Sequence, residues 1–176
     1  MNTFQSIYKE GKWQTSLPKK SDAALVFAFG DRHAMATSHM LSQLKSSFPE
    51  AEIVGCSTSG EIQGSEIHDE SIALTAVHFE KSHVVAKSDN ISNYADSSSL
   101  GAALVNQLDH NGLRYVFVVS DGQLINGSEL IEGITGALPK NVLVTGGLAG
   151  DQARFKETIV WHNDNVTKGL VVVVGF

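Results

Sequence analysis

The sequence predicts a mixed α/β fold, in which helices pack on one or more sheets with both parallel and antiparallel strands. Continuous apolar runs, such as Ala23–Phe29 and Tyr115–Val119, are typical of strands buried on both faces. Segments with apolar residues at helical spacing separate these runs, which is the order of elements found in α/β domains. A single sheet and two packed sheets both satisfy this pattern.

Composition defines the size of the domain and the class of partner. The chain has 176 residues, of which 42% are hydrophobic and 18% charged, so we expect one domain with a sizeable core. The formal net charge of −6 argues against nucleic acid or an anionic membrane as the main partner. No apolar run approaches the length of a membrane span, and no signal peptide is recognisable at Met1. We therefore expect a cytoplasmic protein.

The first half is expected to begin with a surface arm, residues 1–20, followed by the strand at Ala23–Phe29. Asp31 is placed to cap a helix, and Pro49 follows the end of that helix. The apolar positions of this helix are Ala36, Met40, Leu41, Leu44 and Phe48. Further strands are predicted at 52–54, 71–79 and 83–88, with the last two joined as a hairpin.

The second half is predicted to repeat this order of elements. Ser97–His110 is predicted to form a helix, and Tyr115–Val119 a buried strand. Ser128 is placed to cap a further helix that Pro139 stops. Short strands are predicted at 142–144, 158–162 and 170–174.

The two halves look like an internal duplication, with boundaries at about 21–90 and 91–176. Ala23–Gly30 corresponds to Tyr115–Gly122, and Val54–Glu61 to Val144–Asp151. The match depends on the order of the elements and on the glycine-containing loops. It predicts strand–helix–strand units that each end in such a loop.

Glycines and small polar residues gather just after the predicted strands at 52–54 and 142–144. Glycine allows a sharp turn or a close approach of a ligand, and ligands of open α/β sheets bind at the carboxyl ends of strands. Asp121 follows another buried strand. The residues predicted to line a ligand site are Gly55, Cys56, Ser57, Thr58, Ser59, Gly60, Glu61, Asp121, Gly146, Gly147 and Asp151. In the alternative interpretation these segments are tight turns that bind no ligand.

Three segments, in order, resemble motifs of the FIST family of sensory domains. Ile53–Ile62 (IVGCSTSGEI) resembles the signature of its N-terminal domain, Ser120–Leu130 its middle segment, and Val144–Asp151 (VTGGLAGD) its third motif. The resemblance extends over about residues 20–176. It implies an intracellular sensor without catalysis that binds a small ligand, such as an amino acid, and signals to a partner.

The same resemblance implies further partners. Family members usually continue into a second, C-terminal FIST domain, so we expect this chain to be the N-terminal part of a longer protein. The expected output partner is a signalling protein such as a histidine kinase or a cyclic-dinucleotide enzyme.

The predicted site residues suggest how a ligand would be recognised. Glu61, Asp121 and Asp151 could bind an amino group, and backbone N–H groups of the glycine loops could hold a carboxylate. This chemistry predicts a zwitterionic ligand. The GxGxxG and GxxxxGK[ST] patterns are absent from residues 146–150, which argues against a nucleotide.

Alternatives of other classes are also considered. Some FIST proteins are described as haem-bound nitric-oxide sensors, and haem needs an axial ligand such as histidine. The chain has seven histidines, and none lies in an HExxH motif. None stands out as a haem ligand, although His78 and His83 could meet across the expected hairpin.

Cys56, the single cysteine, is interpreted as an inert thiol, with ligand-contacting, redox-sensing and nucleophilic roles as alternatives. A last alternative is an interaction domain that binds no small molecule.

Overall fold

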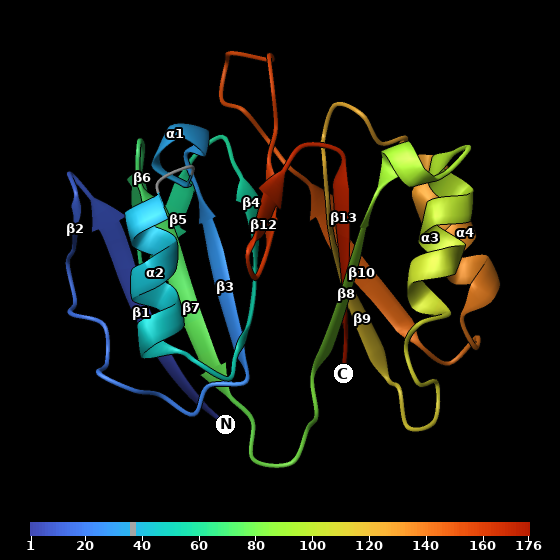
Figure 1. Ribbon diagram of the computed structural model, residues 1–176, viewed down its shortest axis with the longest axis horizontal. Coiled ribbons are helices and arrows are strands. Elements are labelled where there is room, and N and C mark those ends of the chain that lie inside the picture. The colour runs from blue at the N-terminus through green and yellow to red at the C-terminus, as the bar shows by residue number, and fades with distance from the viewer. Residues whose placement is uncertain (36–37) are drawn as a thin grey trace.

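The computed structural model describes residues 1–35 and 38–176. Within these residues the chain forms a seven-stranded sheet, a four-stranded sheet and a separate hairpin, with helices packed on the sheets (Figure 1). The predicted mixed α/β class is confirmed, with two sheets rather than one. Ala36, predicted as an apolar helix position, lies outside the described residues.

The seven-stranded sheet has the order β12-β11-β4-β3-β7-β1-β2. Its strands are β1 (Asn2–Lys9), β2 (Lys12–Trp13), β3 (Leu25–Gly30), β4 (Glu52–Ser57), β7 (Ile72–His78), β11 (Val160–His162) and β12 (Asn165–Thr167). β3 and β4 are parallel, and the other neighbouring strands are antiparallel. Two helices connect β3 to β4: α1 (Arg32–Met35) and α2 (Ser38–Ser47). Asp31 caps α1 as predicted, because its Oδ1 accepts the N–H groups of His33 and Ala34.

The four-stranded sheet has the order β10-β9-β13-β8. Its strands are β8 (Val85–Asn90), β9 (Tyr115–Ser120), β10 (Leu143–Leu148) and β13 (Leu170–Gly175). A 3₁₀ turn, η1 (Ile91–Asn93), and α3 (Ser97–Val105) connect β8 to β9. α4 (Gly127–Ala137) connects the parallel strands β9 and β10. The separate hairpin consists of β5 (Glu61–Gln63) and β6 (Glu66–His68).

Four strands of each sheet share one topology. The order β1-β7-β3-β4 in the larger sheet corresponds to β8-β13-β9-β10 in the smaller one, with the same strand directions throughout. Each of these four-strand sets, with its connecting segments, is called a unit. In each unit a helical connection joins the two parallel strands. A short hairpin follows the second of these strands: β5–β6 in the first unit and β11–β12 in the second. The sequence duplication that this topology suggests stays a prediction.

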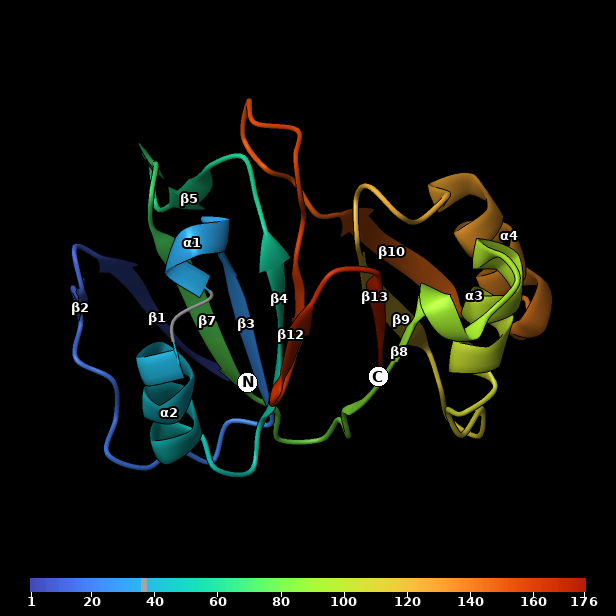
Figure 2. The same ribbon diagram turned by 45° about the horizontal axis from the view of Figure 1, so that its top comes forward.

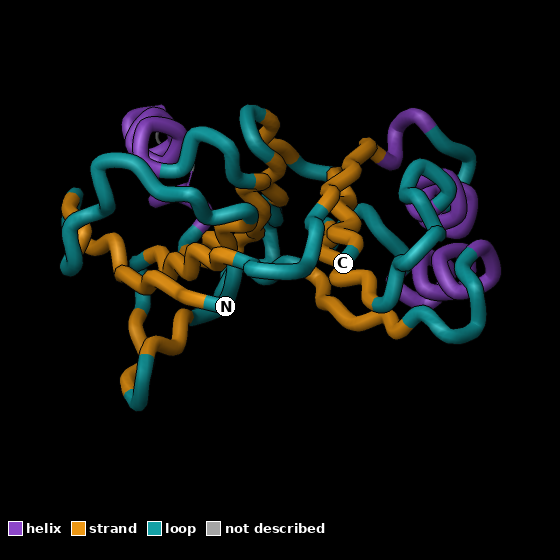
Figure 3. Tube along the Cα trace, turned by 90° about the horizontal axis from the view of Figure 1, so that it is seen from below, coloured by secondary structure: helices purple, strands orange, loops and turns teal. Residues whose placement is uncertain are grey.

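Three clusters of buried side chains make up the core. α1 and α2 bury Met35, Met40 and Leu44 against the larger sheet, and α3 and α4 form a second cluster with the smaller sheet. The third cluster joins both sheets and includes Leu25 of β3 and Val172 of β13. The helices therefore lie on the outer faces of two sheets that meet in the middle of the molecule (Figure 3).

Several predicted elements differ from the structure. The expected arm contains β1, because Ile7 is completely buried and β1 pairs along its length with β7. The prediction of a hairpin between 71–79 and 83–88 is wrong, because β7 and β8 belong to different sheets. The chain crosses from one sheet to the other after His78. His78 and His83 therefore do not face each other across a strand pair. The cap of α4 is Asn126 rather than Ser128: the Asn126 side chain accepts the N–H groups of Ser128 and Glu129.

Two strands are longer than predicted. β4 continues through Ser57, and β10 continues through Leu148. Gly55, Gly146 and Gly147 therefore lie in strands rather than in the predicted loops. The helices of the described residues are too short or too polar to span a membrane.

Candidate functional site

Two predicted glycines lie where parallel strands approach closely. Gly55 of β4 is the register partner of Ala28, and Gly146 of β10 is the partner of Val118. A Cβ atom at Gly55 would lie 1.7 Å from the Ala28 carbonyl oxygen, and one at Gly146 would lie 2.0 Å from that of Val118. Both glycines are therefore explained by strand packing.

The ends of the two predicted segments come together beyond the strands. The Gly150 N–H donates a hydrogen bond to the Ser57 carbonyl oxygen at 2.8 Å. The Cβ position of Gly150 also lies 2.7 Å from Ser59 Oγ. The loop after β4 thus contacts the loop after β10, at the carboxyl ends of both parallel pairs. Gly146 and Gly147 lie apart from this junction and line a different hollow, beside α4.

An ion-pair cluster holds the loop after β10 against the end of β3. Arg154 bridges two carboxylates: its Nη2 lies 2.7 Å from Asp31 Oδ2, and its Nε lies 2.8 Å from Asp151 Oδ1. Arg32 Nε approaches the same Asp151 oxygen at 3.2 Å. Both aspartates are buried. The cluster connects the two units, because Asp31 and Arg32 follow β3 whereas Asp151 and Arg154 follow β10.

The cluster keeps its carboxylates ionised. Burial alone raises the pKa of Asp151, but hydrogen bonds from the Glu157 N–H, Arg154 and the Lys156 N–H, with the charge of Arg32, lower the pKa to about 2. Burial similarly raises the pKa of Asp31, and hydrogen bonds from Arg154 and the capped N–H groups outweigh it and lower the pKa. The cluster is therefore charged at neutral pH.

The other predicted carboxylates already have partners. Asp121 is completely buried, and its oxygens accept the N–H groups of Gln123, Leu124 and Gly169. Glu61 is also buried, and it accepts hydrogen bonds from the hydroxyl groups of Thr58 and Ser71. Glu61, Asp121 and Asp151 all accept hydrogen bonds from within the fold, so a ligand amine would compete with these partners.

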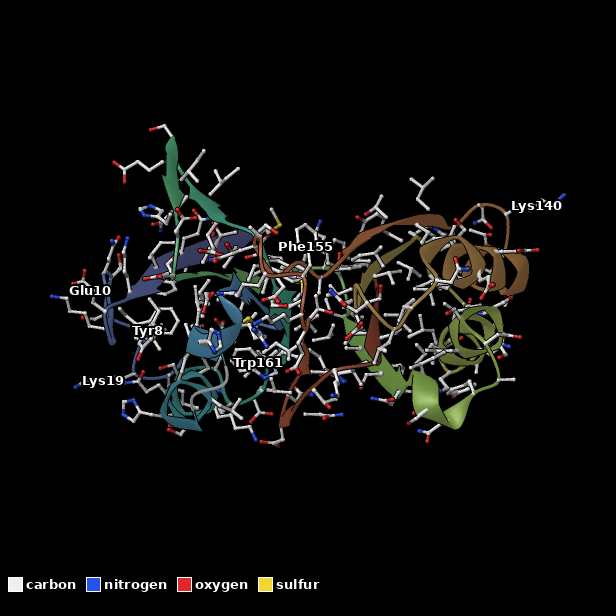
Figure 4. The ribbon with its side chains drawn as sticks, turned by 90° about the horizontal axis from the view of Figure 1, so that it is seen from above. Tyr8, Glu10, Lys19, Lys140, Phe155 and Trp161 are labelled. Carbon is white, nitrogen blue, oxygen red and sulfur yellow. The ribbon has the colours of Figure 1, made fainter. Side chains whose placement is uncertain are left out.

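A hollow of about 590 Å³ lies beside the junction. It is lined by Ser59, Asp69, Glu70, Gln152, Ala153 and Phe155. Two carboxylates and the 80% exposed Phe155 ring make it an acidic surface with an aromatic wall. Figure 4 shows Phe155 at the middle of the molecule, on the loop that follows β10. Of the predicted site residues, Ser59 lines this hollow directly.

The backbone of the lining loop adopts an uncommon conformation. Gln152 and Phe155 both have φ of 49°. Residues other than glycine, asparagine and aspartate rarely adopt this left-handed conformation. Such residues persist only where the surroundings hold them, and they are frequent at ligand sites. Glu70, at φ 52°, has a simpler explanation, because it occupies the position of Gly169 before the next strand of its unit.

Several residues of this site were not predicted from the sequence. Arg32 and Arg154 lack a motif, and their role depends on a contact between loops far apart in sequence. Asp69, Glu70 and Phe155 lie on segments that carry no glycine motif. A usable signal was the pair Asp31-Arg32 directly after a buried strand, at the strand end where α/β proteins place their sites.

The structure does not favour a nucleophilic role for Cys56. Its side chain is buried, and burial raises the pKa of the thiol to about 12. A thiol with this pKa is almost entirely protonated at neutral pH. The inert interpretation of Cys56 is the one that its position supports.

A metal site is not evident in the described part of the chain. No cluster of three or more His, Cys, Asp or Glu side chains suited to a metal occurs among them. His78 lines a hollow of about 190 Å³, and its Nδ1 lies 3.2 Å from an Asp22 carboxylate oxygen. Haem binding therefore stays a prediction from the family resemblance.

The chain belongs to the FIST family. The model of the FIST N domain matches residues 24–176, nearly the whole chain, and it confirms the resemblance to this family. FIST domains are sensory domains of signalling proteins rather than a family of enzymes. No curated protein was found that matches the chain.

Proposed function

We propose that this domain is a cytoplasmic sensor that binds a small zwitterionic ligand, such as an amino acid, in the hollow between Ser59 and Phe155. The observation that supports the proposal is the meeting of the two predicted segments at an acidic hollow with an aromatic wall. The amino group of the ligand is assigned to Asp69 and Glu70, rather than to the carboxylates first predicted from the sequence. Gln152 and the Ser59 hydroxyl supply hydrogen-bond donors for the carboxylate.

The proposed signal passes through the loop that lines the hollow. Gln152 and Phe155 contact the ligand in this proposal, and Arg154 between them is paired with Asp31 at the end of β3. A ligand that moves this loop changes the contact between the two units. The expected receiver is a second FIST domain, and through it a histidine kinase or a cyclic-dinucleotide enzyme, as the family resemblance implies.

The first experiment measures thermal unfolding of the chain against a panel of amino acids and their decarboxylated amines. A ligand at 100 times its dissociation constant stabilises the folded state by about 2.7 kcal/mol, which is readily measured. We expect at least one amino acid to stabilise the chain. The matching amine should bind more weakly, because it lacks the carboxylate that Gln152 and Ser59 would hold.

Substitutions then test the assignment of the groups. Asp69→Asn and Glu70→Gln should each weaken binding by roughly 10- to 100-fold, because a charge-assisted hydrogen bond contributes about 1.5–3 kcal/mol. Asp109→Asn and Glu132→Gln make the same chemical changes at exposed positions away from the hollow and should leave affinity unchanged. If no amino acid binds, or the control variants weaken binding equally, the proposed site is wrong.

A further inference from the structure

The β5–β6 and β11–β12 hairpins occupy the same place in the two units. Each follows the second strand of the parallel pair and precedes the next antiparallel strand. Each has three paired positions around a turn whose first residue, Gly64 or Asn163, has positive φ (60° and 52°). The central pair is Ile62 with Ile67 in one hairpin and Trp161 with Val166 in the other. The hairpins therefore correspond position by position.

The second hairpin shows what such a hairpin does with a partner. β11 pairs antiparallel with β4, and Trp161 is the register partner of Gly55. Trp161 is completely buried in the cluster that contains Met40 and Leu44 of α2, and Val166 packs against the same cluster. The hairpin thus extends a sheet and fills the groove between the edge strand and the helix.

The corresponding groove of the other unit is open. β10 is the edge of the four-stranded sheet, and within residues 1–35 and 38–176 its sheet partner is β9 alone. A hollow of about 180 Å³ lies between β10 and α4, where Ile131 is 43% and Leu148 is 53% exposed. Figure 2 shows β10 running beside α4. An edge strand beside an apolar groove is a template for the addition of a strand.

The β5–β6 hairpin has the apolar face that this groove lacks. Ile62 and Ile67 are 73% and 77% exposed, and as directly opposed partners they lie on one face of the hairpin. In the described part of the chain, β6 is the sheet partner of β5. The hairpin projects from the side of the sheet opposite α2, which is also the side on which β10 lies (Figures 3 and 4).

We propose that the β5–β6 hairpin of one copy of this chain adds to β10 of a second copy, as β11 adds to β4 within one copy. The internal contact fixes the register, so that Ile62 lies opposite Gly146 and Gln63 opposite Thr145. Ile62 and Ile67 fill the groove against α4. A second copy is the assigned occupant because each chain carries both the groove and the hairpin. This inference does not depend on the proposed ligand.

Site-specific cross-linking tests the register. Gln63→Cys and Thr145→Cys are made in separate chains, which are then mixed and mildly oxidised. Opposed antiparallel residues have Cα atoms about 4.5–5.5 Å apart, within the range of a disulfide. We expect a disulfide-linked dimer from this mixture. The mixture of Gln63→Cys with Leu143→Cys, two positions further along β10, should give little product.

The association constant tests the apolar contact. Sedimentation equilibrium of the unmodified chain should show reversible self-association, and Ile62→Glu, Ile67→Glu and Ile131→Glu should each weaken it by about tenfold or more. Val85→Glu is the matched control, because Val85 is an exposed apolar side chain on β8, at the opposite edge of the four-stranded sheet, and its replacement should have no effect. These side chains are exposed, so the variants are expected to fold, which circular dichroism verifies.

Three outcomes would overturn the proposal. If the chain stays monomeric at every concentration and gives no cross-link, β10 does not bind a second copy, and its edge is left to another segment or protein. A dimer that Val85→Glu weakens as much as Ile62→Glu does has a different interface. Equal cross-linking at Leu143 and Thr145 contradicts the register.

Discussion

Asp31 and Asp121 occupy corresponding positions, each directly after the central strand of its unit. Each carboxylate accepts the N–H groups two and three residues further along. Their remaining oxygens differ: Asp31 binds Arg154 across the junction, whereas Asp121 accepts the Gly169 N–H. The same capping aspartate therefore makes a contact between two loops in the first unit and stabilises a buried turn in the second.

The pKa of Asp151 predicts a dependence of stability on pH. Its folded-state pKa of about 2 lies below the ordinary value of about 3.9, so the folded state holds the proton less tightly than the unfolded state. The stabilisation is complete above about pH 4 and is lost as the pH falls through 2. A shift of about two units corresponds to roughly 2–3 kcal/mol.

Asp151→Asn tests this prediction by urea unfolding between pH 6 and pH 2. The free energy of unfolding should fall by roughly 2–3 kcal/mol at pH 6, and the difference from the unmodified chain should shrink toward pH 2. Asp164→Asn removes a carboxylate that is paired with Lys45 on the surface and should change stability by less than about 1 kcal/mol. A pH-independent difference for Asp151→Asn would contradict the assignment.

At the scale of elements, the parallel strand pairs explain the glycines that the sequence suggested were loop residues. Gly55 and Gly146 each allow the backbone of the neighbouring strand to approach, at equivalent positions of β4 and β10. Gly55 also lies opposite Trp161. A glycine motif after an apolar run thus marks a strand crossing as readily as a ligand loop.

Gly55→Ala should strongly destabilise the chain. The added Cβ would lie 1.7 Å from a backbone oxygen, so β3 and β4 must separate, and overpacking of this kind costs about 1–3 kcal/mol or more. Gly136→Ala is the matched control, since nothing lies within 4 Å of its Cβ position in α4. That variant should be stabilised by about 0.5–1 kcal/mol. Equal effects of the two substitutions on urea unfolding would refute the packing explanation.

At the scale of the whole molecule, the two sequence halves do not form separate bodies. The β11–β12 hairpin of the second half completes the sheet of the first, and Trp161 lies in the core of the first half. His162 lies between the sheets: its ring nitrogens lie 2.7 Å from Ser88 Oγ and 3.1 Å from Glu52 Oε2. The His162 hydrogen bond lowers the pKa of Glu52 although burial opposes it.

Because the second half contributes a hairpin to the sheet of the first, we expect both units to unfold together. Trp161→Ala should reduce the free energy of unfolding by about 3–5 kcal/mol while leaving one transition. Circular dichroism in the far and near ultraviolet should give coincident urea curves. Trp13→Ala, at the half-buried edge of the larger sheet, should cost less. Two separate transitions in the unmodified chain would show that the units are independent.

Local patterns determined much of this protein. Apolar runs located the strands β3, β7, β9 and β13. Helical spacing between Asp31 and Pro49 predicted one helix in the segment where α1 and α2 lie, because burial and capping depend on nearby residues. The three motifs were sufficient to indicate the FIST family. Ser59 lies at the junction of the two segments, as expected for a residue that follows the carboxyl end of a strand.

Contacts between distant residues decided the rest. Only the tertiary structure assigns β8 to the second sheet, pairs Arg154 with Asp31, and places Asp69 and Phe155 around one hollow. It also reveals that one hairpin is buried while its counterpart is exposed. Pairing and ion contacts of this kind join segments separated by many residues, and no local pattern of apolarity or glycine specifies which partner each segment meets.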